Sequence, residues 1–157
     1  MDEKWVKAMG CMVHGIYVLT ASYKGEINGM IASWVSQVSY EPPLIMVAIH
    51  PDRYSHRFVE RGGSFALHLI SREQKDLLSR FKGPDPAAKF AGIRWAKGMT
   101  GAPVLQDCIA YFECTVKTSF NPGNHTMFLG EVVGGDFVSP GTPLSTLDYE
   151  GFYRGDR

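Results

Sequence analysis

The feature that most limits the fold of this chain is a succession of short strand-like segments, separated by turn residues and interrupted by only short helical patterns. Residues 108–118 (CIAYFECTVKT) show the pattern most clearly, because apolar and more polar side chains alternate with period two. Strand-helix-strand units do not repeat along the sequence, which favours an antiparallel barrel over a doubly wound parallel sheet. We therefore expect residues 1–157 to form one mainly β domain with a few short α-helices.

The expected strands are rich in β-branched, aromatic and aliphatic residues and are bounded by turn chemistry. They cover residues 12–21, 27–38, 44–49, 64–70, 108–118 and 126–138. The unbroken apolar run 44–49 predicts a strand buried on both faces. Asn121-Pro122-Gly123-Asn124 predicts a hairpin turn, and Gly134-Gly135 predicts a bulge or bend in the last strand.

Three short helices are expected from their capping residues. Ser55 can cap the first, and Gly62 or Gly63 supplies its left-handed exit. Ser71 and Gln74 form a capping box at the start of a helix that reaches Phe81. Asp85-Pro86 opens the third, with Asp as the cap and Pro at the first helical position.

Composition argues against several kinds of partner. Lys plus Arg equals Asp plus Glu at 16 each, with no basic run, which disfavours nucleic acid. No apolar run approaches the ~20 residues that span a bilayer, and the N-terminus lacks the order of a secretion signal. We therefore expect a cytoplasmic protein with no membrane partner.

Metal and common catalytic signatures are also missing from the sequence. Cys11, Cys108 and Cys114 have no C-x-x-C spacing and predict reduced, mostly buried thiols. His50 and His56 lack the spacing of a helical metal site, so no metal is expected. The dinucleotide, phosphate-loop, serine hydrolase and zinc protease motifs are absent too. From the residues alone, the sequence predicts only a β-rich domain.

A series of motifs then resembles a known family. Residues 25–39 read G-x-x-N-G-M-I-A-S-W-V-S-Q-V-S and are followed by Pro42-Pro43 and the apolar strand. Agreement continues through Ser55, residues 65–69 and 71–81, Lys89-Phe90, residues 101–103 and residues 123–126. In order and spacing these motifs resemble the flavin reductase-like, FMN-binding split-barrel family, close to its flavoredoxin branch. The resemblance implies an antiparallel split β-barrel with Greek-key connections, in a homodimer whose flavin sites lie near the interface.

The resemblance also implies a set of flavin-contacting residues. They are Asn28, Gly29, Met30, Ile31, Ala32, Ser33, Trp34, Ser36 and Gln37 along one segment, and Arg53, Ser55, His56, Lys89, His125 and Phe152 elsewhere. The residue types suit FMN, which needs its phosphate held at a helix N-terminus, polar contacts to the ribityl chain and a surface for the flat ring.

Each of these residues has an ordinary structural alternative. Ser55 could be only a helix cap, and Lys89 only a surface lysine. Trp34 could belong to the core, and Asn28 with Gly29 could form a turn. His125, which matches a histidine that contacts flavin or nicotinamide in relatives, could lie on the surface. Phe152, or its neighbour Tyr153, could cover the flavin ring or pack on the partner subunit.

The activity that the resemblance implies is that of an NAD(P)H:flavin oxidoreductase. NAD(P)H would bind transiently and transfer hydride to flavin N5, and electrons would then pass to a redox protein or monooxygenase. FMN is expected as the cofactor before FAD or riboflavin. Two alternatives stay open: an FMN electron carrier of the flavoredoxin type without its own NAD(P)H activity, and a flavin-storing or flavin-sensing module.

Overall fold

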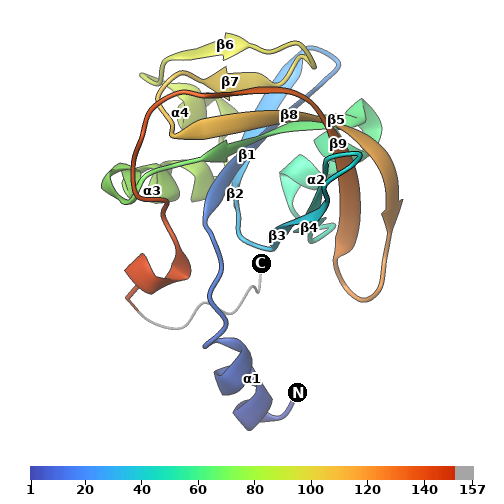
Figure 1. Cartoon of the computed structure of the whole chain (residues 1–157), viewed down its shortest axis with the longest axis vertical. Helices are drawn as coiled ribbons and strands as arrows, with labels where there is room; N and C mark the ends of the chain where they lie inside the picture. Colours follow the sequence, from blue (N-terminus) through green and yellow to red (C-terminus); the bar gives the residue numbers. More distant parts are fainter. Residues whose placement is uncertain (151–157) are drawn as a thin grey trace.

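The computed structural model describes residues 1–150, and its main feature is an antiparallel sheet that curls into an open barrel (Figure 1). The seven strands lie in the order β2-β1-β5-β8-β9-β4-β3. They are β1 (Tyr17–Tyr23), β2 (Glu26–Ala32), β3 (Val35–Ser39), β4 (Leu44–Ile49), β5 (Ser64–Leu69), β8 (Ala110–Phe120) and β9 (Thr126–Phe137). Strands β2 and β3 are the two edges of the sheet, so the barrel is split between them, as expected for a split barrel.

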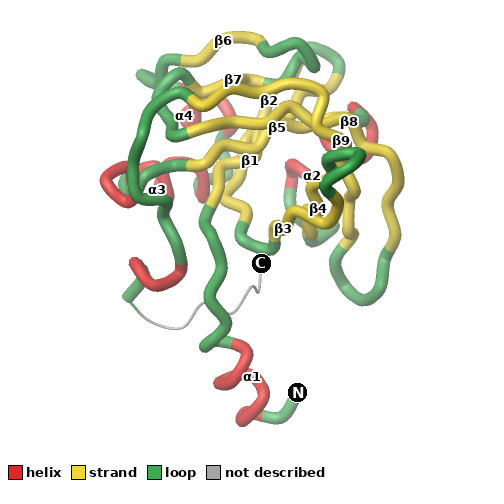
Figure 2. Tube along the Cα trace, viewed as in Figure 1, coloured by secondary structure: helices red, strands yellow, loops and turns green. Residues whose placement is uncertain are grey.

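The remaining elements are short and lie around this sheet, as the colouring in Figure 2 makes plain. They are the helices α1 (Glu3–Met9), α2 (Tyr54–Gly62), α3 (Leu77–Lys82) and α4 (Pro86–Phe90), the 3-10 turns η1 (Arg72–Gln74) and η2 (Thr146–Asp148), and the two-stranded ribbon β6 (Trp95–Lys97) and β7 (Pro103–Leu105). Helix α1 projects away from the barrel. No helix within residues 1–150 is long and apolar enough to span a membrane.

Two apolar clusters pack on the two faces of β1, because successive strand side chains point in opposite directions. Leu19 joins a cluster enclosed by the curled sheet, which Phe58 and Val59 of α2 help to fill. Val18 joins a second cluster on the outer face, which also contains side chains from α3, α4 and β7. The second cluster fixes α3 and α4 beside β2, and this packing positions the site described below.

Most of the expected elements are confirmed. Strands β4, β5 and β8 match the predicted segments closely, and β8 and β9 form the predicted hairpin. The register between them shifts beside Gly134, where a bulge was expected. Both halves of the Ser71 and Gln74 capping box are present, and Asp85 Oδ1 accepts a hydrogen bond from the Ala87 amide at 3.0 Å.

Several boundaries differ because strands exist only where a neighbouring strand pairs with them. The segment predicted as one strand over 12–21 begins only at Tyr17, the first residue that pairs with β2 and β5. The segment predicted over 27–38 is two strands, because β2 pairs with β1 whereas β3 pairs with β4. The expected burial of both faces of 44–49 is also wrong, since alternate residues of β4 are only half-buried.

The helical predictions need two corrections. Arg53, not Ser55, occupies the N-cap position of α2, although Gly63 provides the predicted left-handed exit with φ 72°. The helix predicted from Ser71 to Phe81 is divided into η1 and α3. Helix α1 and the ribbon β6-β7 were not among the expected elements.

The loop between β6 and β7 changes the environment of Glu113 on β8. The alternation in residues 108–118 placed it on the polar face, yet its side chain is buried. The loop between β6 and β7 covers that face, and Glu113 accepts hydrogen bonds from the backbone amides of Met99 and Thr100 and from the Thr100 hydroxyl. The carboxylate therefore anchors this loop to β8.

Candidate functional site

A buried polar network joins three elements at one end of the split barrel. Lys89 Nζ, on α4, donates hydrogen bonds to Asn28 Oδ1 at 3.0 Å and to the Gly29 carbonyl oxygen at 2.8 Å, both on β2. Asn28 Nδ2 in turn donates to Ser55 Oγ, in the first turn of α2, at 2.9 Å. The network accounts for the wrong cap assignment, because the Ser55 hydroxyl is directed to Asn28 rather than to the backbone of its own helix.

Close packing brings α4 near enough to β2 for this network to form. A Cβ atom on Gly29 would lie 2.7 Å from Phe81 Cε1 and 3.3 Å from Phe90 Cζ. These two rings contact each other edge to face, with centroids 5.5 Å apart. Glycine at position 29 therefore allows the aromatic pair to lie against the strand, and the pair holds Lys89 in place.

The network lies beside a cavity of about 260 Å³ that is rich in positive charge. Its lining residues come from β2, the start of α2 and the segment around α3 and α4: Asn28, Met30, Asp52, Arg53, Tyr54, Ser55, Phe81, Lys82, Gly83, Pro84 and Lys89. Burial, followed by repulsion from Arg53, lowers the pKa of Lys89, and attraction to Asp85 opposes that shift. Three cations near a helix N-terminus make the cavity suitable for an anionic group.

A second group of side chains gathers where β3 begins. The rings of Trp34 and His125 have centroids 4.5 Å apart, and the His50 ring meets His125 edge-on at 5.2 Å. Burial, with repulsion from His50 and Arg53, lowers the pKa of His125, which keeps the imidazole neutral near pH 7. Because Arg53 acts on both Lys89 and His125, it electrostatically links the two groups.

The remaining predicted residues occupy varied positions. Met30 lines the positive cavity, and its neighbours Ile31, Ala32 and Ser33 are half-buried or buried on β2 or directly after it. Trp34 and Ser36 line a larger, mostly apolar recess of about 840 Å³ between the N-terminal segment and the outer faces of β3, β4 and β9. Gln37 lines a separate cavity inside the barrel.

His56 lies apart from the positive cavity. Its Nε2 is 2.8 Å from Thr126 Oγ1, and its ring meets Phe128 of β9 edge-on. Burial lowers its pKa. A direct cofactor contact by His56 therefore stays a prediction, as do the roles of Phe152 and Tyr153, which lie outside the described residues.

Among the residues that the structure places at the site, His50, Asp52 and Lys82 were not predicted from the sequence. His50 directly follows β4 and contacts His125, while Asp52 and Lys82 line the positive cavity. A polar residue at the end of a buried apolar strand was the signal that could have identified His50. Lys82 had no comparable signal, because it enters the cavity through the packing of α3.

Within residues 1–150, no group of three or more His, Cys, Asp or Glu side chains is arranged to hold a metal ion. Cys108 and Cys114 are buried free thiols, whereas Cys11 is exposed. Burial raises the pKa of Cys108 to about 11 and that of Cys114 to about 12, so both are protonated at neutral pH. The chemistry available at the site is thus that of a polar and aromatic binding pocket.

Known proteins resemble this chain in both sequence and structure. It is 36% identical over 141 residues to diflavin flavoprotein A 1 of Synechocystis, covering 86% of this chain but 24% of that protein. It is 31% identical over 147 residues to HsaB, the reductase subunit of a flavin-dependent monooxygenase of Mycobacterium tuberculosis, covering 94% of this chain and 78% of HsaB. The solved structure of the NADH:FAD oxidoreductase SgcE6 of Streptomyces globisporus has a TM-score of 0.80 at 27% identity, covering 87% of this chain and 85% of SgcE6.

The family comparison covers nearly the whole chain. The family model described as flavin reductase like domain matches residues 9–155, which include every strand of the barrel and both groups of site residues. The mainly antiparallel open barrel agrees with that match. The chain belongs to the flavin reductase-like domain family.

Proposed function

We propose that this protein is an FMN-dependent oxidoreductase that takes electrons from NAD(P)H. The observation that carries the proposal is the buried network of Lys89, Asn28 and Ser55 beside a cavity with two further cations. The network consists of polar groups that a globular core would ordinarily avoid, and it lies next to a cavity suited to a phosphate.

The residues of the site fit the three parts of FMN. Arg53 and Lys82, with the start of α2, would hold the phosphate, and Ser55 and Lys89 would bind the phosphate or ribityl end. The backbone of Met30 to Ser33 would face the polar edge of the ring, and Trp34 offers a flat surface beside it. A bound flavin would supply the chemistry of hydride acceptance and electron transfer, and the protein would supply position, shielding and hydrogen bonds that set its potential.

His125 would act as a neutral contact for the flavin or the nicotinamide. Its Nδ1 lies 2.8 Å from Asn124 Oδ1, and because an amide oxygen only accepts, this contact assigns the ring proton to Nδ1. Nε2 is then an acceptor. A neutral His125 ring adds no positive charge to the site. We therefore assign to Lys89 the role of stabilising the negative charge of reduced flavin.

The choice of FMN is tested by titrating the full chain with FMN, FAD and riboflavin and following flavin fluorescence. We expect FMN to bind more tightly than riboflavin, because only FMN carries the phosphate for Arg53, Lys82 and Lys89. Equal affinity for FMN and riboflavin would contradict the proposal that these three residues bind the phosphate. If FAD, the flavin in the name of SgcE6, binds more tightly than FMN, the proposed cofactor becomes FAD.

The activity is tested by mixing the FMN-loaded protein anaerobically with NADH or NADPH and following flavin absorbance. Rapid bleaching by one of the two, faster than with free FMN, is the expected result. The absence of bleaching with both would favour the electron carrier.

We further propose two protein partners. HsaB is named as the reductase subunit of a monooxygenase, and a comparable oxygenase or redox protein is the proposed acceptor of electrons here. The second partner is another copy of this chain. Helix α1 has no buried residue, and the recess of about 840 Å³ between the N-terminal segment and the barrel is mostly apolar, so a second subunit would cover both.

A further inference from the structure

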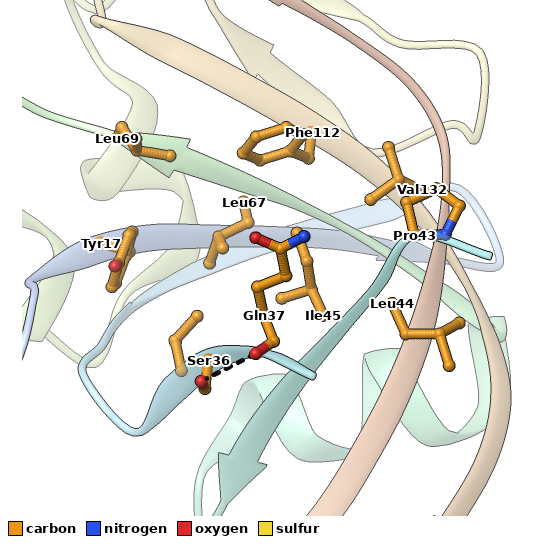
Figure 3. Close-up of a pocket in the computed structure, with 11 residues that line it drawn as sticks. Tyr17, Ser36, Gln37, Pro43, Leu44, Ile45, Leu67, Leu69, Phe112 and Val132 are labelled. Atoms are coloured by element: carbon orange, nitrogen blue, oxygen red, sulfur yellow. Dashed lines mark hydrogen bonds between the residues drawn. The ribbon is translucent and has the colours of Figure 1, made fainter. Parts of the chain in front are cut away.

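The barrel contains a second cavity, of about 240 Å³, that the proposed flavin site does not use. Figure 3 shows its lining, which comes from six strands of the sheet and the turn before β4; Tyr17, Gln37, Leu44, Leu69, Phe112 and Val132 are among the residues drawn. Strand β3 separates it from the recess that contains Trp34, and Val35 and Ser36 line both spaces. The cavity shares no lining residue with the positive cavity, although two of the residues predicted to contact flavin, Ser36 and Gln37, line it.

The lining sets the chemical class of a ligand. All of the residues that line the cavity are uncharged, and most are aliphatic or aromatic. An ion would lose its hydration there without gaining a counter-charge, so a neutral ligand is favoured. The rings of Tyr17 and Phe112 add aromatic surfaces, which favour a flat ring over an aliphatic chain.

Two polar side chains in the lining could orient a ligand by hydrogen bonding. The Gln37 side chain reaches into it toward Leu67 and Phe112 (Figure 3), and its Nε2 makes only a long hydrogen bond of 3.4 Å to the Ser39 carbonyl oxygen. Within the part of the chain that the structure describes, neither Gln37 Oε1 nor the Tyr17 hydroxyl has a hydrogen-bond partner. A ligand with one hydroxyl group could donate to Gln37.

The volume suits a substituted ring. A dry apolar cavity of about 150 Å³ is large enough to bind benzene in a well-studied engineered case. The cavity here is larger and has polar side chains in its lining, so it can hold a benzene ring with a polar substituent.

We propose that this cavity binds a small, neutral aromatic compound that carries a hydroxyl group, with the ring between Tyr17 and Phe112 and the hydroxyl at Gln37. The site does not depend on the proposed flavin chemistry, because it shares with the Trp34 recess only Val35 and Ser36.

The experiment is calorimetric titration of the full chain with phenol, with benzoate as a charged comparator. We expect one phenol per chain, with a dissociation constant of about 1 mM or tighter, and on the order of tenfold weaker binding of benzoate. Val132→Phe fills the cavity and should weaken phenol binding about tenfold or more. The matched control is Val133→Phe, at a neighbouring residue that is 42% exposed and outside the lining, which should leave phenol binding unchanged.

Saturation with FMN should also leave phenol binding unchanged, whereas competition between the two would place phenol in the flavin site and overturn the proposal. The proposal also fails if phenol gives no saturable heat, or if Val132→Phe binds phenol as well as the parent chain. Loss of self-association in Val132→Phe, without phenol binding by the parent, would assign the cavity to a second copy instead. Should Val132→Phe not fold, Gln37→Leu at the exposed mouth gives the same test, with weaker phenol binding expected.

Discussion

At the scale of single residues, Lys89 illustrates how a site can be built from an ordinary amino acid. A lysine on a short helix is usually solvated, yet this side chain is only 5% exposed and donates to two oxygens of β2. Replacing it removes a charge from the cavity and leaves two buried acceptors without their donor. Both effects can be measured separately.

We expect Lys89→Met to weaken FMN binding on the order of tenfold or more and to lower the free energy of unfolding by about 1–3 kcal/mol, because Asn28 Oδ1 and the Gly29 carbonyl lose a partner. Fluorescence titration and urea denaturation measure the two effects. Lys97→Met, on the exposed strand β6, is the control and should change neither. Unchanged FMN affinity in Lys89→Met would return Lys89 to a purely structural role.

His68 is a buried residue whose protonation should set part of the pH dependence of stability. Its Nε2 accepts from the Leu105 amide at 3.0 Å, and Nδ1 lies 3.0 Å from the Val18 carbonyl oxygen, so the neutral ring bridges β7 and β1. Burial lowers its pKa to about 4, against hydrogen bonding to Val18 and attraction to Glu113, which raise it.

Because the unfolded chain binds a proton near pH 6.5 and the folded chain only near pH 4, stability should fall as the pH drops through that window. The expected loss from His68 is about 3 kcal/mol, complete near pH 4 and absent above about pH 7. Urea denaturation at several pH values should show a smaller loss in His68→Gln. Identical profiles for the parent and His68→Gln would contradict the assignment.

At the scale of elements, the packing of α3 and α4 on β2 decides whether the polar network can form. The sequence predicted each of these segments separately from caps and periodicity. Their contact depends on Phe81 and Phe90 meeting Gly29, which lies far from both in sequence. A change at this contact should therefore affect stability and flavin binding together.

We expect Gly29→Ala to destabilise the fold by about 1–3 kcal/mol, because the new methyl group would clash with the Phe81 ring. The displaced α4 should also weaken FMN binding. Gly123→Ala is the matched control, since a Cβ there meets nothing within 4 Å. Thermal denaturation and FMN titration of both variants provide the comparison, and a parental melting temperature for Gly29→Ala would show that the rings yield without cost.

At the scale of the whole molecule, the N-terminal segment that projects from the barrel exposes apolar side chains. Helix α1 and the residues after it expose Trp5, Met9, Met12 and Val13 by 54–62% each. Such a cluster on a projecting segment is typical of a surface that another subunit covers. The adjacent recess includes Trp34, so self-association and flavin binding should be coupled.

We expect the chain to sediment as a dimer, and Trp5→Glu combined with Met9→Glu to shift it toward the monomer of 17.4 kDa and weaken FMN binding. Met99→Glu, which is 70% exposed in the loop between β6 and β7, is the control and should remain dimeric. A parent chain that sediments as a monomer at all concentrations would contradict the proposed dimer.

The sequence by itself determined the local features of this protein. Period-two alternation marked β8, the Asn121 to Asn124 turn marked the hairpin, and the caps at Ser71 and Asp85 marked helix starts, because these signals depend on residues close together in the chain. The order of motifs also indicated the family before any contact was known.

Only the tertiary structure decided which of these segments meet. It divided 27–38 into β2 and β3, directed Ser55 to Asn28, and brought His125 onto Trp34. Strand pairing and side-chain packing join residues tens of positions apart, and neither periodicity nor capping specifies such partners. The sequence could therefore nominate candidates such as Asn28, Ser55 and Lys89, whereas their contacts with one another depend on the way the open sheet curls around α2 and is covered by α3 and α4 (Figure 1).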